Sequence, residues 1–495
     1  MSSQDFADES SENGSYHHES VENGGSDPND TYPHCSPLAL EQIRMAFTGM
    51  VCIEECPPRM IECPIFKDFV STLNPFVKTG DFQSLKDDCL KYYEAEMIQI
   101  KHVLTNMDGK INLSVEMLKR YAFYDYLCLR AHFVDDTWKL KKWVLRFQIL
   151  HWESIPEAIL KILEYWGIRD KVLAITLRSN ILYDETVEML KSYIEKKSEV
   201  QVKSKLFHVY CCAEFLTSMA QDALEEIPII IDKSRGLIAL EFVDPSYLLS
   251  AEEWKRLKGI SKLVDKLHGV AEILFHAKYP TASTFLNNLY DLGVSLKRDF
   301  SNSCSYINAI VEKLQQKFGK YWEDMFLVMA IAAVMDPRSS FLQQEISECD
   351  SCPSDCEIGG SNSEKEEEDL PNKKRKVGVA SCEGEATNMT SHLEEYRQFV
   401  QASSRPPRPE LDWYLEEPVP AWDQDFNMLK LWKSERPKYP TLSKMAHDLL
   451  SIPFSVVSSY DAYYTEEKLV DKRLLSSSVA LMNALMCTRS WHQRR

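Results

Sequence analysis

The sequence Ile111-Asn-Leu-Ser-Val115 resembles a short β-strand, and strand and helix patterns alternate in the residues that follow it. Two longer β-rich runs come next, at 124–134 and 138–150, with the turn residues Asp135-Asp-Thr137 between them. After them the pattern predicts, in turn, helix, strand, helix, strand and helix, at 155–166, 171–177, 184–194, 206–210 and 211–224. A meander of three strands that leads into βαβ units predicts an α/β fold.

The order of these elements, β-β-β-α-β-α-β-α, is that of a ribonuclease H-like domain. Residues 231–346 differ in character, because apolar side chains recur there at helical spacing, most clearly from Trp254 to Leu274. Strand signals are few in this range. The sequence therefore predicts an N-terminal helical region and a ribonuclease H-like core at 37–230, followed by an all-helical insertion at 231–346.

Two polar stretches separate the ordered parts of the chain. Residues 1–36 and 347–409 have the composition of segments that bury too little apolar surface to offset the entropy of ordering, so both are predicted to be disordered. The last ordered part is a tail at 410–495. A net charge of −18 over 495 residues argues against a protein that coats nucleic acid over its whole surface, and leaves room for local basic patches.

The fourteen cysteines are scattered along the chain. Two groups of three lie close together, namely Cys52, Cys56 and Cys63, and Cys349, Cys352 and Cys356. Because neither group has a fourth Cys or His at the spacing of a zinc finger, we predict free thiols and expect no metal and no cofactor. The longest apolar run, Phe326–Met335, is about half as long as a membrane helix must be, so no membrane partner is expected.

The tail contains several motifs in a recognisable order: Glu410-Leu-Asp-Trp-Tyr-Leu-Glu-Glu-Pro418, Leu431-Trp-Lys433, Pro437-Lys-Tyr-Pro-Thr-Leu-Ser443 and Ile452-Pro453. It resembles the dimerisation block of hAT-superfamily transposases and of the plant sleeper-type proteins derived from them. Further landmarks of that family occur in its order, among them Tyr126-Leu-Cys-Leu-Arg-Ala-His-Phe-Val134, Phe207-His-Val-Tyr-Cys-Cys-Ala213 and Met335-Asp-Pro-Arg338. The resemblance implies a ribonuclease H-like domain interrupted by an all-helical insertion, with a mainly helical C-terminal dimerisation region.

The chemistry of that family is phosphoryl transfer on DNA, for which carboxylates must hold two divalent metals close together. The resemblance places the three ligand positions at Glu116, Arg178 and Tyr460. Glu116 is a carboxylate, although it is one methylene longer than the aspartate of the family. Arg178 stays protonated and has no lone pair for a metal, and Tyr460 is a neutral phenol at ordinary pH. We therefore predict that the catalytic positions are degenerate and that the chain is not an enzyme.

Neighbouring residues are poor substitutes for the missing ligands. Asp461 lies one residue beyond the third position, and on a helix that step turns a side chain about 100° away. Asp184 matches a family position near the start of the next helix, but Arg178 would repel a metal held there. Glu214 stands where the family has a histidine. A residual metal-dependent nuclease that uses Glu116 and Asp184 is the alternative from the enzyme class.

A basic motif, Pro371-Asn-Lys-Lys-Arg-Lys-Val377, resembles nuclear import signals and lies in the predicted disordered linker, where a receptor can reach it. Its charges come from Lys373, Lys374, Arg375 and Lys376. The alternative is a solvated charge run that balances the acidic cluster beside it. The motif predicts a nuclear protein with an import receptor as a partner. No BED zinc finger of the sleeper type is recognisable, so DNA is only a candidate partner.

The tail concentrates more apolar side chains than so short a segment can bury alone. The residues predicted to serve dimerisation are Trp413, Leu415, Trp432, Leu450, Leu481, Leu485 and Trp491. Part of the tail must pack on the ribonuclease H-like body, and the alternative is that all of it does. The resemblance favours a homodimer or a heterodimer with another hAT-derived protein.

The combined prediction is a domesticated, catalytically inactive hAT transposase-like protein of the nucleus. It dimerises and acts in DNA-associated transcriptional or chromatin regulation. A regulator that binds DNA through the ribonuclease H-like surface itself is a second hypothesis.

Overall fold

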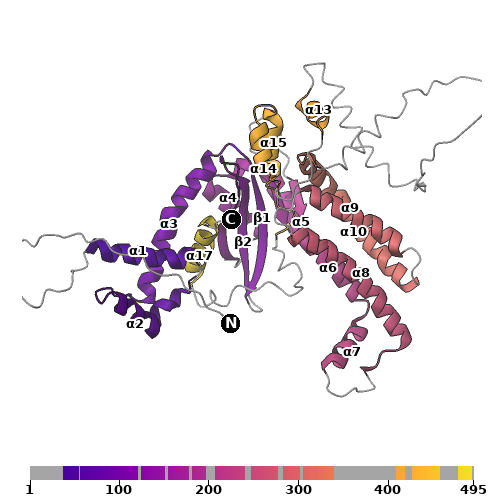
Figure 1. The fold of residues 1–495 in the computed structure, drawn as a ribbon, viewed down its shortest axis with the longest axis horizontal. Coiled ribbons are helices and arrows are strands. Elements are labelled where there is room, and N and C mark those ends of the chain that lie inside the picture. The colour runs from indigo at the N-terminus through magenta and orange to yellow at the C-terminus, as the bar shows by residue number, and fades with distance from the viewer. Residues whose placement is uncertain are drawn as a thin grey trace, which may run out of the picture.

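The structure is a computed structural model that describes residues 37–54, 56–120, 124–150, 154–177, 181–196, 207–239, 247–276, 282–300, 305–338, 409–418, 426–456 and 478–492. The polar stretch predicted at 1–36 lies outside these ranges, and so does the one at 347–409 apart from Pro409. A central sheet separates two groups of helices (Figure 1).

The sheet has five strands of mixed direction. They are β1 (Ile111–Arg120), β2 (Tyr124–Val134), β3 (Leu140–Leu150), β4 (Val172–Leu177) and β5 (Phe207–Tyr210). Their order across the sheet is β3-β2-β1-β4-β5. The first three strands form an antiparallel meander, whereas β4 runs parallel to β1 and β5 runs parallel to β4. This arrangement confirms the predicted α/β class and its meander followed by βαβ units.

Two strand boundaries differ from the prediction. β1 is longer than expected because its second half is paired with β2 throughout. β3 begins at Leu140, later than predicted, because a tight turn precedes it. In that turn Asp135 Oδ1 accepts hydrogen bonds from the backbone N–H groups of Thr137 at 3.0 Å and Lys139 at 2.9 Å. Trp138 lies between them with a φ of 65°, a left-handed conformation that a strand residue does not adopt.

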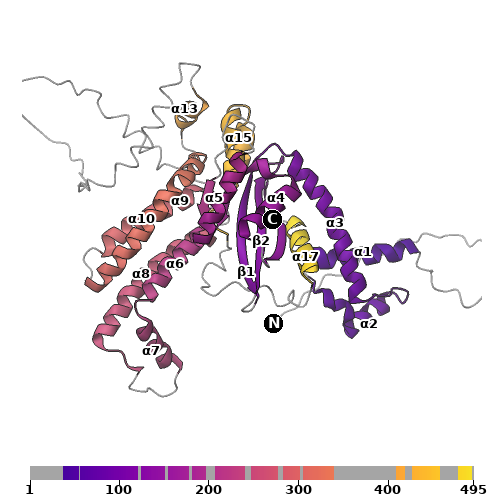
Figure 2. The same cartoon turned by 180° about the vertical axis from the view of Figure 1, so that it is seen from behind.

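One face of the sheet packs against helices from both ends of the described chain. These helices are α1 (Pro37–Ile53), α3 (Phe82–Asn106), α4 (Ile155–Trp166) and α17 (Val479–His492), while α2 (Pro64–Leu73) packs on α1 through Phe66 and Phe47 and has no buried residue. Figures 1 and 2 both show α17 between the sheet and α3. Leu104, Leu129 and Leu485 are fully buried there and belong to one continuous cluster, which we call the first core.

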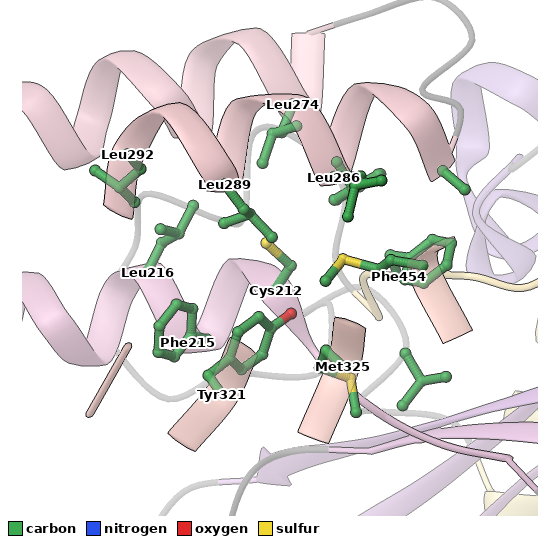
Figure 3. Close-up of a cluster of buried hydrophobic side chains, with 14 of the residues drawn as sticks. Cys212, Phe215, Leu216, Leu274, Leu286, Leu289, Leu292, Tyr321, Met325 and Phe454 are labelled. Atoms are coloured by element: carbon green, nitrogen blue, oxygen red, sulfur yellow. The ribbon is translucent and has the colours of Figure 1, made fainter. Parts of the chain in front are cut away.

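The second core lies on the other side and is built mainly from long helices. They are α6 (Cys212–Leu224), α7 (Pro228–Ala239), α8 (Ala251–His276), α9 (Ala282–Phe300) and α10 (Ser305–Val334). The helix α5 (Ile181–Lys196), which joins β4 to β5, places Val187 and Leu190 in the first core instead. Figure 3 shows leucines of α9 above Cys212 and Phe215, with Tyr321 below. The rings of Phe215 and Tyr321 are stacked at 3.8 Å. In the described part of residues 231–346 the regular elements are α-helices, as expected for a helical insertion, while its boundaries stay predictions.

The tail divides between the two cores. Its first helices, α13 (Glu410–Leu415), α14 (Met428–Glu435) and α15 (Pro440–Leu449), pack on the second core, whereas α17 completes the first. The Glu410 carboxylate accepts hydrogen bonds from the backbone N–H groups of Thr441 at 2.9 Å and Leu442 at 3.0 Å. Because these groups begin α15 and have no partner within the helix, this contact fixes α13 against α15.

The helix α17 also covers β3, which is an edge strand of the sheet. Ser490 Oγ accepts a hydrogen bond from the backbone N–H of Val144 at 2.8 Å, and Asn483 Oδ1 accepts one from that of Phe147 at 2.9 Å. Trp491 Nε1 donates to Val144 O at 3.0 Å. Polar groups that an edge strand would leave open to another chain are therefore satisfied inside the molecule.

Candidate functional site

One of the three predicted catalytic positions, Glu116, lies within the described residues. Arg178 and Tyr460 lie outside them, and the side chain of Asp184 is also not described. Glu116 is part of β1, in the middle of the sheet.

Glu116 forms an ion pair with an arginine of the next strand. Arg130 lies on β2, where it is paired with Ser114, the residue two positions before Glu116 on the same face of β1. Arg130 Nη1 donates a hydrogen bond to Glu116 Oε2 at 2.5 Å, and the two side chains are only 17% and 11% exposed. The retained carboxylate thus already has a cationic partner, close by and largely shielded from water.

A second polar pair lies beside the first. Ser114 Oγ and His132 Nε2 are 2.8 Å apart, and both residues are buried. Burial lowers the pKa of His132 well below its ordinary value, and the positive charges of Lys142 and Arg130 lower it further. His132 is therefore neutral at pH 7, and its bond to Ser114 is one between uncharged groups.

The tail crosses this polar face of the sheet. Asn112 Nδ2 on β1 donates to Asp448 O at 2.9 Å and to Ser451 Oγ at 2.8 Å. On β4, Thr176 Oγ1 donates to Pro453 O at 2.5 Å. The tail therefore contacts both β1 and β4 shortly before residues 457–477, which lie outside the described part of the chain and include Tyr460.

The cysteine groups give no support for a metal. Within the described ranges, no three His, Cys, Asp or Glu side chains lie together in a way that could hold a metal ion. Cys52, Cys56 and Cys63 form no disulfide bond. The other group, Cys349, Cys352 and Cys356, lies outside the described residues.

Arg130 is the functional residue that sequence reasoning missed. Its signal was present, because a charged residue stands between Leu129 and Ala131 in a run whose other members, apart from His132, are apolar. Such a residue needs a partner when the strand is buried. The partner could not be named without the register that sets β1 against β2.

Comparisons with known protein families match three parts of the chain. The family model of the ZBED1 RNase-like domain matches residues 114–206, and that of the hAT-like transposase, RNase-H fold, matches residues 283–348. The hAT family C-terminal dimerisation region matches residues 410–492. The chain carries hAT-type domains. Glu116 and Arg130 therefore lie in the part of the chain that matches the ZBED1 RNase-like domain.

Similar proteins agree with this assignment over most of the chain. "Zinc finger BED domain-containing protein RICESLEEPER 1" of Oryza sativa subsp. japonica is 25% identical, over 90% of this chain and 73% of its own length. "Zinc finger BED domain-containing protein DAYSLEEPER" of Arabidopsis thaliana is 24% identical, over 91% of this chain and 73% of its own. The "Putative AC transposase" of Zea mays is 22% identical, over 93% of this chain and 66% of its own length. The chain is thus similar both to sleeper-type proteins and to hAT transposases.

The hAT dimerisation region holds all seven residues predicted to serve dimerisation, and that role stays a prediction. Trp432, Leu481, Leu485 and Trp491 are buried within one chain, the first in the second core and the others in the first core. Their apolar side chains pack inside the molecule.

The other three of these residues are less enclosed. Leu415 and Leu450 are partly buried against the second core. Trp413 is 56% exposed and is the one of the seven that presents most of its side chain to the outside.

Two predicted features remain, the import motif and the absence of a membrane-spanning helix. The import motif at Lys373, Lys374, Arg375 and Lys376 lies outside the described residues. Among the helices of the described ranges, none combines the length and the apolar character that crossing a membrane requires.

Proposed function

We propose that this chain is a non-catalytic protein derived from hAT transposases. In this proposal it pairs with itself or with a related protein and takes part in DNA-associated transcriptional or chromatin regulation in the nucleus. The observation that supports it best is the Glu116–Arg130 ion pair, with 2.5 Å between Nη1 and Oε2. The match of residues 410–492 to a dimerisation region supports pairing.

The ion pair opposes metal chemistry at this position for an electrostatic reason. A two-metal site needs carboxylates that are free to neutralise divalent cations. Here the Glu116 charge is already balanced by Arg130. At an effective dielectric constant of 20, two like unit charges 4 Å apart repel by about 4 kcal/mol, and a divalent ion beside a guanidinium doubles that cost. Arg178, at the second ligand position of the sequence, would add a further positive charge.

A cleavage assay tests the non-catalytic part of the proposal. Purified full-length protein should leave duplex and hairpin DNA intact in the presence of Mg²⁺ or Mn²⁺. A Glu116→Gln variant purified in the same way is the control for contaminating nucleases. Cleavage by the unchanged protein that disappears in Glu116→Gln would show that the chain is an enzyme, and the proposal would then be wrong.

The nuclear part of the proposal predicts a localisation. A fluorescent fusion should accumulate in the nucleus, and replacing Lys373, Lys374, Arg375 and Lys376 with alanine should move it largely to the cytoplasm, because import receptors recognise this type of cationic cluster. Fluorescence microscopy measures the ratio between the compartments. The test needs a variant that does not pair, since an unchanged partner could carry the mutant in. Unchanged nuclear accumulation of that variant would remove the motif from the proposal.

A further inference from the structure

Three large apolar side chains of the helix α2 are mostly exposed. Ile65, Phe69 and Leu73 have exposed fractions of 80%, 58% and 70%. They follow one another at intervals of four residues, so they lie one above the other on a single face of the helix. We call these three residues the α2 stripe. No residue of α2 is buried, so a single chain leaves the stripe in contact with water.

Another residue attaches α2 to the molecule. Phe66 stacks on Phe47 of α1, with 5.1 Å between the ring centroids and an interplanar angle of 28°. Phe47 in turn packs against the first core. Figures 1 and 2 both show α2 at the outer side of the N-terminal helices, away from the sheet. Substitutions in the stripe can therefore test contacts between chains without disturbing the core.

The exposed surface has the size of a functional patch. Together with Phe76, which follows the helix and is 42% exposed, the stripe presents on the order of 500 Å² of apolar side chain. Patches of about 300–600 Å² are the largest on a typical monomer and often serve binding. Two copies that covered this surface on one another would bury about 1,000 Å², the size of a weak but specific interface.

Charge does not oppose the approach of a second copy at α2. The chain carries a net charge of −18, so most faces of two copies repel one another. In α2 the charged residues are Lys67 and Asp68, whose charges cancel. Two copies can therefore meet at this helix without the repulsion that the rest of the chain would cause.

The apolar pattern of the stripe is the same in both directions along the helix. Phe69 stands at the centre, with Ile65 four residues before it and Leu73 four residues after it. When α2 lies antiparallel to a copy of itself, Phe69 meets the partner's Phe69, and Ile65 meets the partner's Leu73. A two-fold contact requires a surface that matches itself in this way, whereas a contact with an unrelated partner does not.

We propose that α2 forms a contact between two copies of this chain, in which the two α2 helices pack antiparallel about a two-fold axis beside Phe69. The neighbouring helix α17 supports a second copy as the occupant, because it lies in the match to the hAT dimerisation region. It also holds α1, the helix on which α2 packs. Arg489 Nη2 donates to Val51 O at 3.3 Å, and Thr488 Oγ1 donates to Cys52 O at 3.0 Å.

This contact is separate from any pairing through the first helices of the tail. Trp413, which is exposed in the dimerisation region, belongs to α13, and α13 lies far from α2 in both views (Figures 1 and 2). A Trp413→Ala variant therefore alters that surface and keeps the α2 stripe. The two contacts can be tested independently of one another.

Photo-cross-linking tests which residues meet. p-Benzoylphenylalanine takes the place of Phe69 in the full-length chain, in the wild type and in Trp413→Ala. Illumination at micromolar concentration should give covalent dimers in both, and mass spectrometry should find residue 69 joined to residues 64–76 of the second chain. The control carries the same amino acid in place of Ser71, which is exposed about 200° around the helix from Phe69. It should give no dimer joined through α2.

Sedimentation velocity measures the strength of the contact in the Trp413→Ala background. Phe69→Asp should raise the dissociation constant at least about tenfold, because each copy would bring a carboxylate into the apolar contact. Ser71→Asp adds the same charge to the same helix outside the stripe, and it should change the constant by no more than about twofold. Circular dichroism of each variant shows whether the fold is kept.

Two results would overturn the proposal. One is the absence of dimers cross-linked within α2, and this result counts whether or not the wild type pairs through its tail, which light scattering of the wild type decides separately. The other is an equal effect of Phe69→Asp and Ser71→Asp, because added charge alone would then explain the loss of association.

Discussion

At the scale of single residues, Glu116 and Arg130 behave as one unit. Placing two ions in a largely buried site costs several kcal/mol, and good geometry between them recovers that cost only while both are present. Their hydrogen bond of 2.5 Å and their low exposure satisfy this condition. Burying either charged side chain is therefore compatible with a stable fold while the other is present, and removing one of them lowers stability.

The first prediction concerns this pair. Arg130→Met should lower the free energy of unfolding by about 3 kcal/mol, because it removes the guanidinium that lies beside the largely buried Glu116 carboxylate. The double variant Glu116→Gln with Arg130→Met should recover at least half of that loss. Urea denaturation followed by circular dichroism measures both. If the double variant is as unstable as the sum of the two single variants, the two residues are not coupled.

The second prediction concerns pH and rests on His132, whose pKa is held well below 6.5 by burial first and by Lys142 and Arg130 next. Below pH 6.5 the unfolded chain takes up a proton on this histidine that the folded chain does not, so the stability it contributes is present above pH 6.5 and falls as the pH drops. His132→Gln should be less stable at pH 7.5 but should lose less stability between pH 7 and pH 5. Parallel slopes for the two proteins would contradict this.

The resemblance predicted Glu116 as a former ligand position, but the sequence could not supply Arg130 as its partner. A shift of β2 by one residue against β1 would have turned Arg130 to the opposite face. The same limit applies to Trp432 and Trp491. Their apolar character was evident, whereas the choice between a partner chain and the chain's own core depends on contacts between segments far apart in the sequence.

At the scale of elements, α17 has a role that its sequence alone does not suggest. It is one helix of the first core, and its Asn483, Ser490 and Trp491 bind backbone groups of β3. Thr488 Oγ1 also donates to Cys52 O of α1 at 3.0 Å. The helix therefore joins the edge of the sheet to the beginning of the described chain.

The third prediction concerns α17. Asn483→Ala should lower the free energy of unfolding by about 1–3 kcal/mol, since the N–H of Phe147 would be left buried without an acceptor. The exposed residue Ala480 of the same helix provides the control, and Ala480→Ser should change stability by no more than about 0.5 kcal/mol. Equal effects of the two substitutions in urea denaturation would mean that the contact between α17 and β3 carries no stability.

At the scale of the whole molecule, the tail contributes to both cores. In the described part of residues 410–492, Trp413 stands out with 56% of its side chain exposed. Large aromatic residues that are exposed in one chain are frequent anchors of interfaces. Pairing, if it uses this region, should therefore depend on the surface around α13.

The fourth prediction follows from that surface. Trp413→Ala should weaken self-association about thirtyfold, the effect of losing an anchor worth about 2 kcal/mol. Leu327→Ala is a matched control, because Leu327 is 50% exposed on α10 and lies outside the dimerisation region. Light scattering over a range of micromolar concentrations measures both. A monomeric wild type that co-purifies with no hAT relative would show that the chain does not pair.

The place of α17 also has a consequence for synthesis on the ribosome. The helices α1 and α3 are made early, but the core they belong to lacks one of its helices until residues 479–492 have emerged. Until then the apolar faces of these helices and the edge of β3 stay open to chaperones and to other nascent chains. A message cut short anywhere before residue 479 would yield a product that cannot close this core. Such a product is a target for degradation and not a smaller working protein.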